Sequence, residues 1–131
     1  MPFNPSDLED THIHKGLRQQ LVRELRAKGI KDEKILAAFM EIPRHFFLEN
    51  TFAEWAYKDV AFTIDADQTI SQPYTVAVQT TLLDLKKGDK VLEIGTGSGF
   101  QACVLAFLGT KVYTIERQKT LFDKTEKLLQ K

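Results

Sequence analysis

The chain has 131 residues, of which 43% are hydrophobic and 27% are charged, a composition typical of one globular unit rather than a disordered segment. Eighteen Lys and Arg residues balance eighteen Asp and Glu residues, so the sequence lacks the positive excess that binding to a phosphate backbone requires. The first ten residues show no cationic stretch followed by an apolar run, and no segment approaches the ~18 uninterrupted apolar residues of a membrane span. The single cysteine, Cys103, excludes an internal disulfide, and His12, His14 and His45 do not have metal-site spacing. We therefore expect a cytoplasmic protein without a metal ion and without nucleic-acid or membrane partners.

The first third of the chain is predicted to be a helical hairpin. Residues 11–28 carry apolar side chains at helical spacing among charged ones, which is typical of a half-buried helix, and Gly29 suits its C-terminal end. Asp32 suits the N-cap of a second helix, and Pro43 limits that helix.

The next stretch is rich in aromatic residues. No basic residues interleave with them as single-strand binding would need, so we expect core or packing residues rather than a stacking platform. These residues are Phe46, Phe47, Phe52, Trp55 and Tyr57.

A short strand, a polar loop and a further helix are expected near the middle of the chain. Residues 61–64 suit a short strand, and residues 65–71 are polar and loop-like. Pro73 suits the first turn of a helix, with Ser71 as its possible cap. Residues 86–89 then predict a turn, which is the single candidate boundary between a helical region, 1–85, and an α/β region, 86–131.

The remaining residues alternate between strand and helix. A buried-type strand is expected over residues 90–94, an apolar helix over 101–108 and a second strand over 111–116. A last helix places Leu121, Thr125 and Leu128 on one face. This order predicts an α/β fold with parallel strands joined by a right-handed crossover.

Three of the seven glycines, Gly95, Gly97 and Gly99, lie between that first strand and its helix. Glycine lets the backbone turn sharply and approach a ligand closely, and the start of the following helix offers unpaired N–H groups. Glu116 follows Gly95 by about 20 residues, at the end of the next strand, where a carboxylate can accept hydrogen bonds from ribose hydroxyls. The pattern predicts an adenosine-type nucleoside site. Glu93, inside the strand, requires a donor such as a ligand ammonium or a backbone N–H.

Other interpretations of the glycine loop fit less well. A dinucleotide fingerprint that starts at Gly95 requires glycine at position 100, which is Phe100, so a nicotinamide-dependent oxidoreductase is disfavoured. A phosphate-binding P-loop requires Gly-Lys-Ser/Thr, which is absent from the sequence. A tight turn that holds no ligand is the remaining structural alternative.

Four segments resemble known methyltransferase motifs. Residues 93–99 resemble the first motif of class I S-adenosylmethionine-dependent methyltransferases, and residues 113–117 resemble their acidic second motif. Residues 68–77 (Gln-Thr-Ile-Ser-Gln-Pro-Tyr-Thr-Val-Ala) and 42–47 (Ile-Pro-Arg-His-Phe-Phe) resemble the more specific motifs of the protein-L-isoaspartate O-methyltransferases. The resemblance runs from about Leu17 to Lys131 in the motif order of that family.

The resemblance implies the N-terminal part of a Rossmann-like doubly wound parallel sheet, preceded by a helical region. It also implies a protein-repair enzyme that transfers a methyl group from S-adenosylmethionine to the α-carboxyl of L-isoaspartyl residues in proteins and peptides, leaving S-adenosylhomocysteine. Ser71 would contact the reacting carboxyl, and no Ser-His-Asp arrangement is expected because the carboxylate nucleophile is already ionised. The residues expected to bind the cofactor are Gln68, Thr69, Ile70, Glu93, Gly95, Thr96, Gly97, Ser98, Gly99, Glu116 and Arg117.

The sequence departs from the family pattern in two respects. Asp65 and Asp67 stand where glycines are expected, and their charges oppose the binding of a substrate carboxylate. Family members also continue well past the point where this chain stops, at Lys131. We therefore expect a fragment that is inactive alone, with an open sheet edge that favours self-association. A non-catalytic nucleoside-binding or interaction module is the alternative function.

Overall fold

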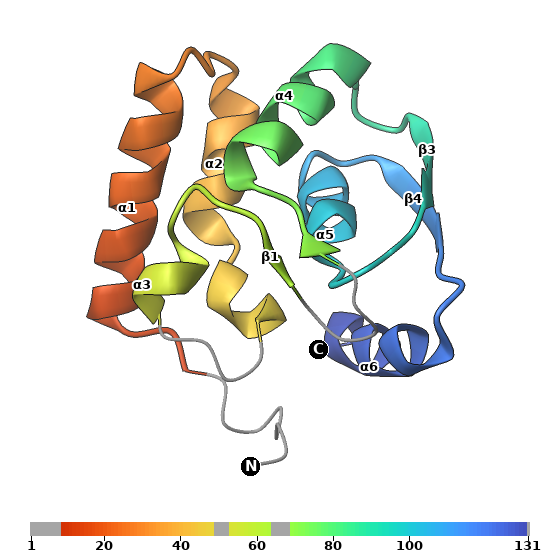
Figure 1. Ribbon diagram of the computed structural model, residues 1–131. Coiled ribbons are helices and arrows are strands. Elements are labelled where there is room, and N and C mark those ends of the chain that lie inside the picture. The colour runs from red at the N-terminus through yellow and green to blue at the C-terminus, as the bar shows by residue number, and fades with distance from the viewer. Residues whose placement is uncertain (1–8, 49–52, 64–68, 131) are drawn as a thin grey trace.

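The computed structural model describes residues 9–48, 53–63 and 69–130. Helices and strands alternate only in the second half of the described chain (Figure 1). In chain order they are α1 (His12–Ala27), α2 (Glu33–Glu41), the 3-10 helix η2 (Arg44–Phe47), α3 (Ala53–Ala56), β1 (Phe62–Thr63), β2 (Thr69–Ile70), α4 (Pro73–Leu83), β3 (Lys90–Ile94), α5 (Phe100–Phe107), β4 (Lys111–Ile115) and α6 (Lys119–Leu129).

The helical hairpin predicted from the sequence is confirmed. Thr11 caps α1, with its side chain accepting from the His14 N–H while the His14 Nδ1 accepts from the Thr11 N–H. Asp32 caps α2 by accepting from the amides of Lys34 and Ile35. Between the two helices Gly29 has a φ of +107°, which is the left-handed conformation expected of a residue that ends a helix.

One hydrophobic core joins the helical region to the α/β region. Helix α1 packs on α2, and α2 in turn packs on α5, where the ring of Phe100 lies edge-on to that of Phe39 with the ring centres 5.6 Å apart. The core therefore crosses the turn at residues 86–89, and the division of the chain into 1–85 and 86–131 stays a prediction. No helix among the described residues has the length and apolar character of a membrane span.

The aromatic stretch is only partly buried. Tyr57 is buried and Phe47 packs against the core, as expected, whereas Phe52 lies outside the described residues. Trp55 lies nearer the surface: its side chain is about half exposed, and the Lys58 ammonium lies 4.0 Å from the centre of its ring.

Strands β3 and β4 pair in parallel, as predicted, with α5 as the crossover between them (Figure 1). Leu92 lies opposite Tyr113, and Glu93 lies opposite Thr114. The helix begins at Phe100, one residue before the predicted start, because Gly99 with its φ of +91° is the N-cap residue.

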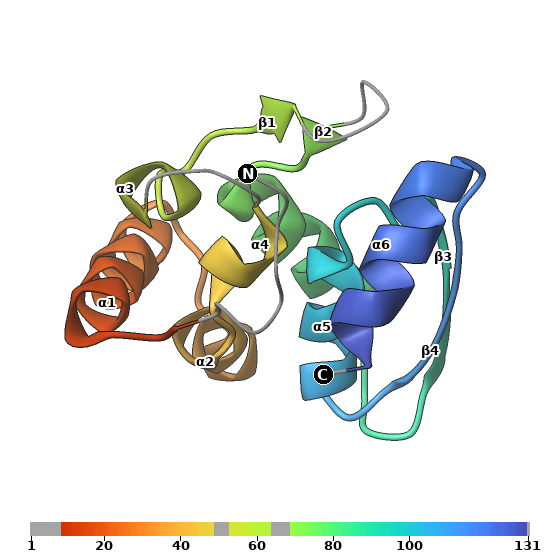
Figure 2. The ribbon, with the colours of Figure 1, turned by 90° about the horizontal axis from the view of Figure 1, so that it is seen from below.

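One face of this sheet is uncovered. Helices α5 and α6 lie on the same side of β3 and β4, and no described element covers the other side (Figure 2). The side chains on that face are apolar and more than half exposed: Leu92, Ile94, Tyr113 and Ile115. Since a parallel sheet is normally covered on both faces, this surface is suited to contact with further protein.

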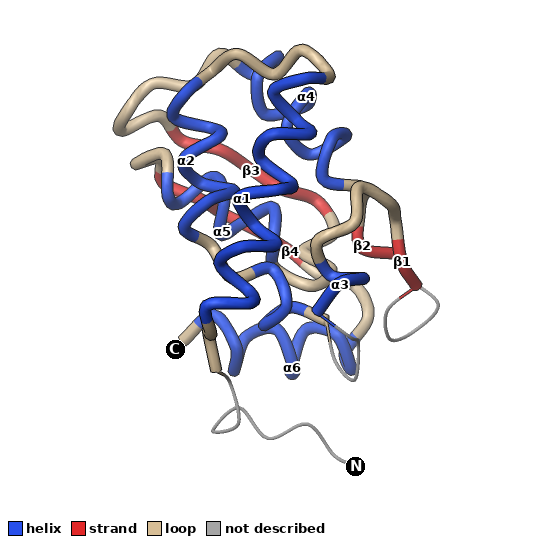
Figure 3. Tube along the Cα trace, turned by 90° about the vertical axis from the view of Figure 1, so that its left-hand side faces the viewer, coloured by secondary structure: helices blue, strands red, loops and turns tan. Residues whose placement is uncertain are grey.

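The short strands β1 and β2 pair antiparallel and lead into α4 (Figure 3). The predicted cap by Ser71 is wrong, because the N-cap residue is Gln72 and no side chain of the segment itself caps the helix. The Tyr74 N–H in the first turn instead donates to Asp59 Oδ1, at 2.7 Å. A carboxylate from another part of the chain thus replaces the local cap.

Candidate functional site

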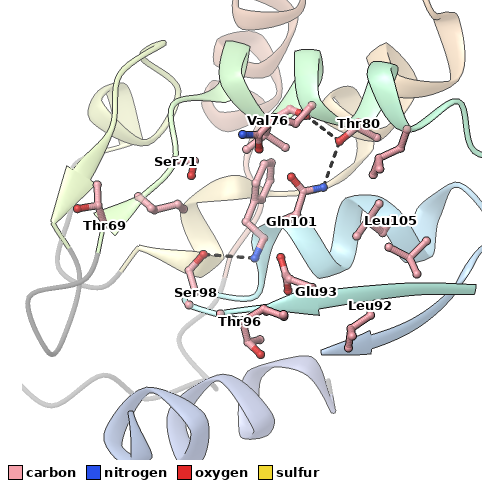
Figure 4. A pocket seen from close by; sticks show the side chains of 18 of the residues that line it. Thr69, Ser71, Val76, Thr80, Leu92, Glu93, Thr96, Ser98, Gln101 and Leu105 are labelled. Carbon is pink, nitrogen blue, oxygen red and sulfur yellow. Dashed lines mark hydrogen bonds between the residues drawn. The ribbon is translucent and has the colours of Figure 1, made fainter. Parts of the chain in front are cut away.

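A cavity of about 540 Å³ opens between α4 and β3 (Figure 4). Residues 69–71 and one face of α4 form one wall, and β3 with residues 95–98 forms the other. A second cavity of about 500 Å³ lies against the ends of β3 and β4. The two share Thr69, Ile94, Gly95 and Gly97, so together they surround the glycine loop at the carboxyl ends of the parallel strands, where ligands of open α/β sheets bind.

The glycine loop has the backbone conformation that only glycine adopts without strain. Gly95, Gly97 and Gly99 have φ values of +91°, +55° and +91°. The amides of Gly95 and Thr96 both donate to the Ile115 carbonyl, at 2.8 and 3.0 Å, which folds the loop over the end of β4. A Cβ at Gly95 would meet nothing within 4 Å, so its backbone faces open space.

Glu116 holds the loop to the end of β4. Its two carboxylate oxygens accept from the amides of Gly97 and Gln118, each at 2.9 Å. The hydrogen bond from Gln118 is the main cause that lowers the pKa of Glu116, so this carboxylate is ionised at neutral pH. Each carboxylate oxygen has a second lone pair, which can accept from a ligand hydroxyl.

Glu93 finds a donor that was not predicted from the sequence. The Thr114 hydroxyl donates to Glu93 Oε1 at 2.7 Å and is itself 2.6 Å from the Thr96 hydroxyl. Because the Thr114 proton is committed to Glu93, Thr96 must be the donor of the second bond. Burial raises the pKa of Glu93, and the nearby charge of Glu116 adds to this rise. The parallel register could have indicated this partner, since Thr114 is opposite Glu93.

Replacing Glu93 by Gln should stabilise the ligand-free protein increasingly as the pH rises above the ordinary pKa of a Glu carboxyl. A carboxyl whose pKa is raised by folding binds more protons in the folded state, so its contribution to stability falls as pH rises from the ordinary value through the folded one. The amide lacks this dependence. Thermal unfolding across this pH range measures the difference, with Thr114→Val as the control that should have the opposite effect at pH 7. A Glu93→Gln variant less stable than the parent at pH 7 would contradict the assignment of burial as the dominant effect.

The structure gathers most of the predicted site residues around the two cavities. Gly99 is the exception, because it faces Thr125 and Leu129 of α6 and lines neither cavity. Gln68 lies outside the described residues, as do Asp65 and Asp67. The first cavity is lined by Thr69, Ile70, Ser71, Glu93, Gly95, Thr96, Gly97 and Ser98, and the second by Thr69, Gly95, Gly97, Glu116 and Arg117.

Thr80 and Gln101 line the first cavity and were not predicted as site residues. Gln101 Nε2 donates to the Thr80 hydroxyl at 3.1 Å, and this hydroxyl donates to the Val76 carbonyl at 2.7 Å, which ties α5 to α4 (Figure 4). Neither residue belongs to the quoted motifs, and the contact joins helices that are about 20 residues apart in sequence. Ser98 accepts from the Phe100 N–H at 3.3 Å, so its hydroxyl serves the start of α5.

Two histidines that lack metal-site spacing in the sequence lie together in the structure, next to Asp10. Ligating atoms of Asp10, His14 and His45 lie within 4.8 Å of one another, and the two imidazole rings stack at 3.8 Å. The folding of η2 against the start of α1 brings these residues together. Both ring nitrogens of His45 have partners at 2.7 Å, the Tyr57 hydroxyl and the Glu9 carbonyl. The Asp10 carboxylate is paired with Arg18 at 2.6 Å, so a hydrogen-bonded network accounts for the cluster.

Parallel strands, a glycine loop at their carboxyl ends and an acidic residue after the second strand define a protein of the Rossmann-like α/β class, with a candidate nucleoside site at the loop. A family model described as protein-L-isoaspartate(D-aspartate) O-methyltransferase matches residues 16–131, and the chain belongs to this family.

Known proteins of the family are similar to this chain in sequence and structure. Protein-L-isoaspartate O-methyltransferases from Christiangramia forsetii and Flavobacterium psychrophilum are 59% and 60% identical over 124 residues, which is 95% of this chain and 58% of each relative. A solved protein-L-isoaspartate O-methyltransferase matches 86% of this chain and 38% of its own length, with 30% identity and a TM-score of 0.77. A second solved structure, from Plasmodium falciparum, shares the fold at 23% identity and a TM-score of 0.70. The chain thus spans little more than half the length of the curated relatives that it matches.

Proposed function

We propose that this protein takes part in methyl transfer from S-adenosylmethionine to the α-carboxyl of L-isoaspartyl residues in damaged proteins and peptides. The observation that carries the proposal is the position of Ser71, across one cavity from the glycine loop (Figure 4). The Ser71 side chain makes no hydrogen bond within the described part of the chain, so its hydroxyl is available to a ligand. Membership of the family and the S-adenosyl-L-homocysteine bound to the Plasmodium falciparum protein support it.

The residues around the cavities suit the proposed roles. Glu116, ionised and next to Arg117, would accept from the ribose hydroxyls, and the open backbone at Gly95 would admit the nucleoside. Glu93 would attract the ligand ammonium, and its second oxygen is not used by Thr114. The sulfonium of the cofactor would supply an activated methyl group. Since the acceptor carboxylate is already a nucleophile, the protein's task is to align it, for which intramolecular models give up to ~7 to 11 kcal/mol.

Calorimetric titration with S-adenosylhomocysteine and with NADH tests the nucleoside assignment. We expect a saturable heat with S-adenosylhomocysteine alone, because Phe100 replaces the glycine that a dinucleotide site requires. An assay of methyl transfer to an isoaspartyl peptide then separates an enzyme from the alternative, a nucleoside-binding module without turnover. Binding of NADH alone would reject the proposal. The cytoplasmic location and the absence of nucleic-acid partners stay predictions.

Replacing Ser71 by Ala should lower affinity for an isoaspartyl peptide, or turnover where it is measured, by more than it lowers affinity for S-adenosylhomocysteine. Loss of one hydrogen bond to a charged group costs ~1.5 to 3 kcal/mol, which is about ten- to hundredfold. Because Ser71 does not cap α4, the unfolding temperature should stay close to that of the parent. Thr75→Ala is the control, because Thr75 lies in the first turn of α4 and lines neither cavity. Equal losses for cofactor and peptide would reject the assignment of Ser71 to the methyl acceptor.

We also propose that the uncovered sheet face causes self-association of the isolated chain. Ile94 is 79% exposed on this face, and β4 is the one strand that pairs with β3 among the described residues, so an apolar strand edge is open to pairing with another chain. Sedimentation velocity should show concentration-dependent dimers that Ile94→Lys abolishes. Ile13→Lys, which changes a 73% exposed isoleucine on α1, should leave them intact. A monomer at all concentrations, or equal effects of both variants, would contradict this interface.

A further inference from the structure

Arg44 is a buried arginine that contacts three separate segments of the chain. Its side chain is in η2, and the residue is only 1% exposed. Its Nε donates to the Ala56 carbonyl and one terminal nitrogen donates to the Ser71 carbonyl, each at 3.0 Å. The guanidinium also lies over the ring of Phe100, 4.7 Å from the ring centre. A single side chain therefore joins α3, the segment before α4 and the first residue after the glycine loop.

The charge of Arg44 is not explained by an ion pair. Within the described ranges no carboxylate lies within ion-pair distance of it, and its Nη1 is buried without a hydrogen-bond partner. Burial lowers the pKa of Arg44 to about 10, with Asp59 acting on it only as a more distant favourable charge. The side chain is thus charged at neutral pH. A buried charge without an ion pair lowers the stability of the fold. Stability alone therefore does not explain why a charged arginine occupies this position.

A second buried charge holds the same segment from its other end. Asp59 accepts from the Tyr74 N–H through Oδ1 and is paired with Lys28 through Oδ2. The Asp59 carbonyl accepts from Gln72 Nε2 at 3.1 Å. Arg44 therefore holds the main chain at Ser71 and Asp59 holds it at Tyr74, and both do so without using the Ser71 hydroxyl.

We propose that Arg44 is a positioning residue that fixes the main chain of Ser71 relative to the start of α5, and so sets the distance between the methyl acceptor and the glycine loop. The geometry carries this inference, because the same guanidinium touches the Ser71 carbonyl and the ring of Phe100, which directly follows Gly99. Its consequence for catalysis rests on the proposed function. A misplacement of about 1 Å at a reacting centre can cost about a hundredfold in rate.

The chain offers a matched control in Arg18. This arginine is also buried, and its Nε donates to a main-chain carbonyl, that of Met40, at 2.8 Å. Its terminal nitrogens bind Asp10 and the Tyr57 hydroxyl, and neither of these residues lines a cavity of the candidate site. Arg18→Lys therefore perturbs a buried guanidinium of the same kind without touching Ser71 or Phe100.

Hydrogen exchange, followed by mass spectrometry on the whole chain without ligand, tests the positioning directly. We expect Arg44→Lys and Arg44→Met to speed exchange at residues 70–76 at least tenfold, while α1 and α2 keep their rates. Lys retains the charge but cannot bridge two carbonyls and stack on a ring, so its effect should be the smaller of the two. Arg18→Lys should speed exchange in α1 and leave residues 70–76 unchanged. Uniform acceleration in the Arg44 variants, or the same pattern in Arg18→Lys, would overturn the proposal.

Binding measurements then separate this inference from the proposed function. Arg44→Lys should change the dissociation constant of S-adenosylhomocysteine less than threefold and weaken the affinity of an isoaspartyl peptide, or lower kcat where turnover is measured, at least tenfold. Equal losses in both would assign Arg44 to the whole site and overturn the positioning role. If the parent chain binds neither ligand, the proposed function fails, and the local or uniform pattern of exchange decides the role of Arg44.

Discussion

Replacing Glu116 by Ala is expected to weaken the binding of S-adenosylhomocysteine about ten- to hundredfold. The carboxylate is the predicted acceptor for ribose hydroxyls, and loss of a hydrogen bond to a charged group costs ~1.5 to 3 kcal/mol. The structure adds a second cause. The same carboxylate binds the Gly97 and Gln118 amides, so its removal also frees the loop that the ligand must meet. Calorimetric titration measures the affinity.

Glu116→Gln separates the two effects. The amide keeps one oxygen of the same shape, which can still accept from a backbone N–H, but it lacks the charge that strengthens bonds from ligand hydroxyls. Its affinity should lie between those of the parent and the Ala variant. Because the pKa of Glu116 is lowered, the contribution of its charge to stability is present above the ordinary Glu value and is lost only as pH falls through the lowered one. An unchanged dissociation constant in Glu116→Ala would exclude this residue from the ribose site.

Local signals in the sequence were sufficient to place the elements that form the site. The cap at Asp32 and the stop at Gly29 act within their own turns, so a few neighbouring residues determine them. The glycine loop and Glu116 are likewise local to strand ends, and parallel pairing brings them together. These are the features for which residue type and spacing carry the physical information.

The errors share a different cause, which is competition from residues far apart in the chain. Ser71 was a reasonable cap by local chemistry, but Asp59 reaches the first turn of α4 and accepts from the Tyr74 N–H there, so the Ser71 hydroxyl does not cap the helix. His14 and His45 are about 30 residues apart, and only the packing of η2 on α1 stacks them. The burial of Arg44 has no sequence signal either, since arginine is normally exposed. Tertiary contacts of this kind decide what each polar side chain near the site does.

Replacing Gly99 by Ala should destabilise the protein by about 3 kcal/mol. A side chain at its φ of +91° costs ~1 to 2 kcal/mol, and overpacking typically adds ~1 to 3 kcal/mol. The new Cβ would lie 2.8 Å from the Thr125 methyl group and 3.2 Å from Leu129, so α6 would have to move away from the loop. Chemical denaturation of the ligand-free chain measures the loss.

Two other glycines divide this effect into its parts. Gly95→Ala has the same φ but open space around its Cβ, so it should cost only the ~1 to 2 kcal/mol of backbone strain. Its larger effect should fall on S-adenosylhomocysteine binding, because the open space at Gly95 lies in both cavities, whereas Gly99 lines neither. Gly16→Ala, in an exposed turn of α1 with nothing within 4 Å, should stabilise by ~0.5 to 1 kcal/mol. The contrary result is that Gly95→Ala and Gly99→Ala lose folding stability and S-adenosylhomocysteine affinity in the same proportion. Gly95 would then not be the ligand-facing residue and Gly99 the packing residue, and contact with α6 would not explain the glycine at position 99.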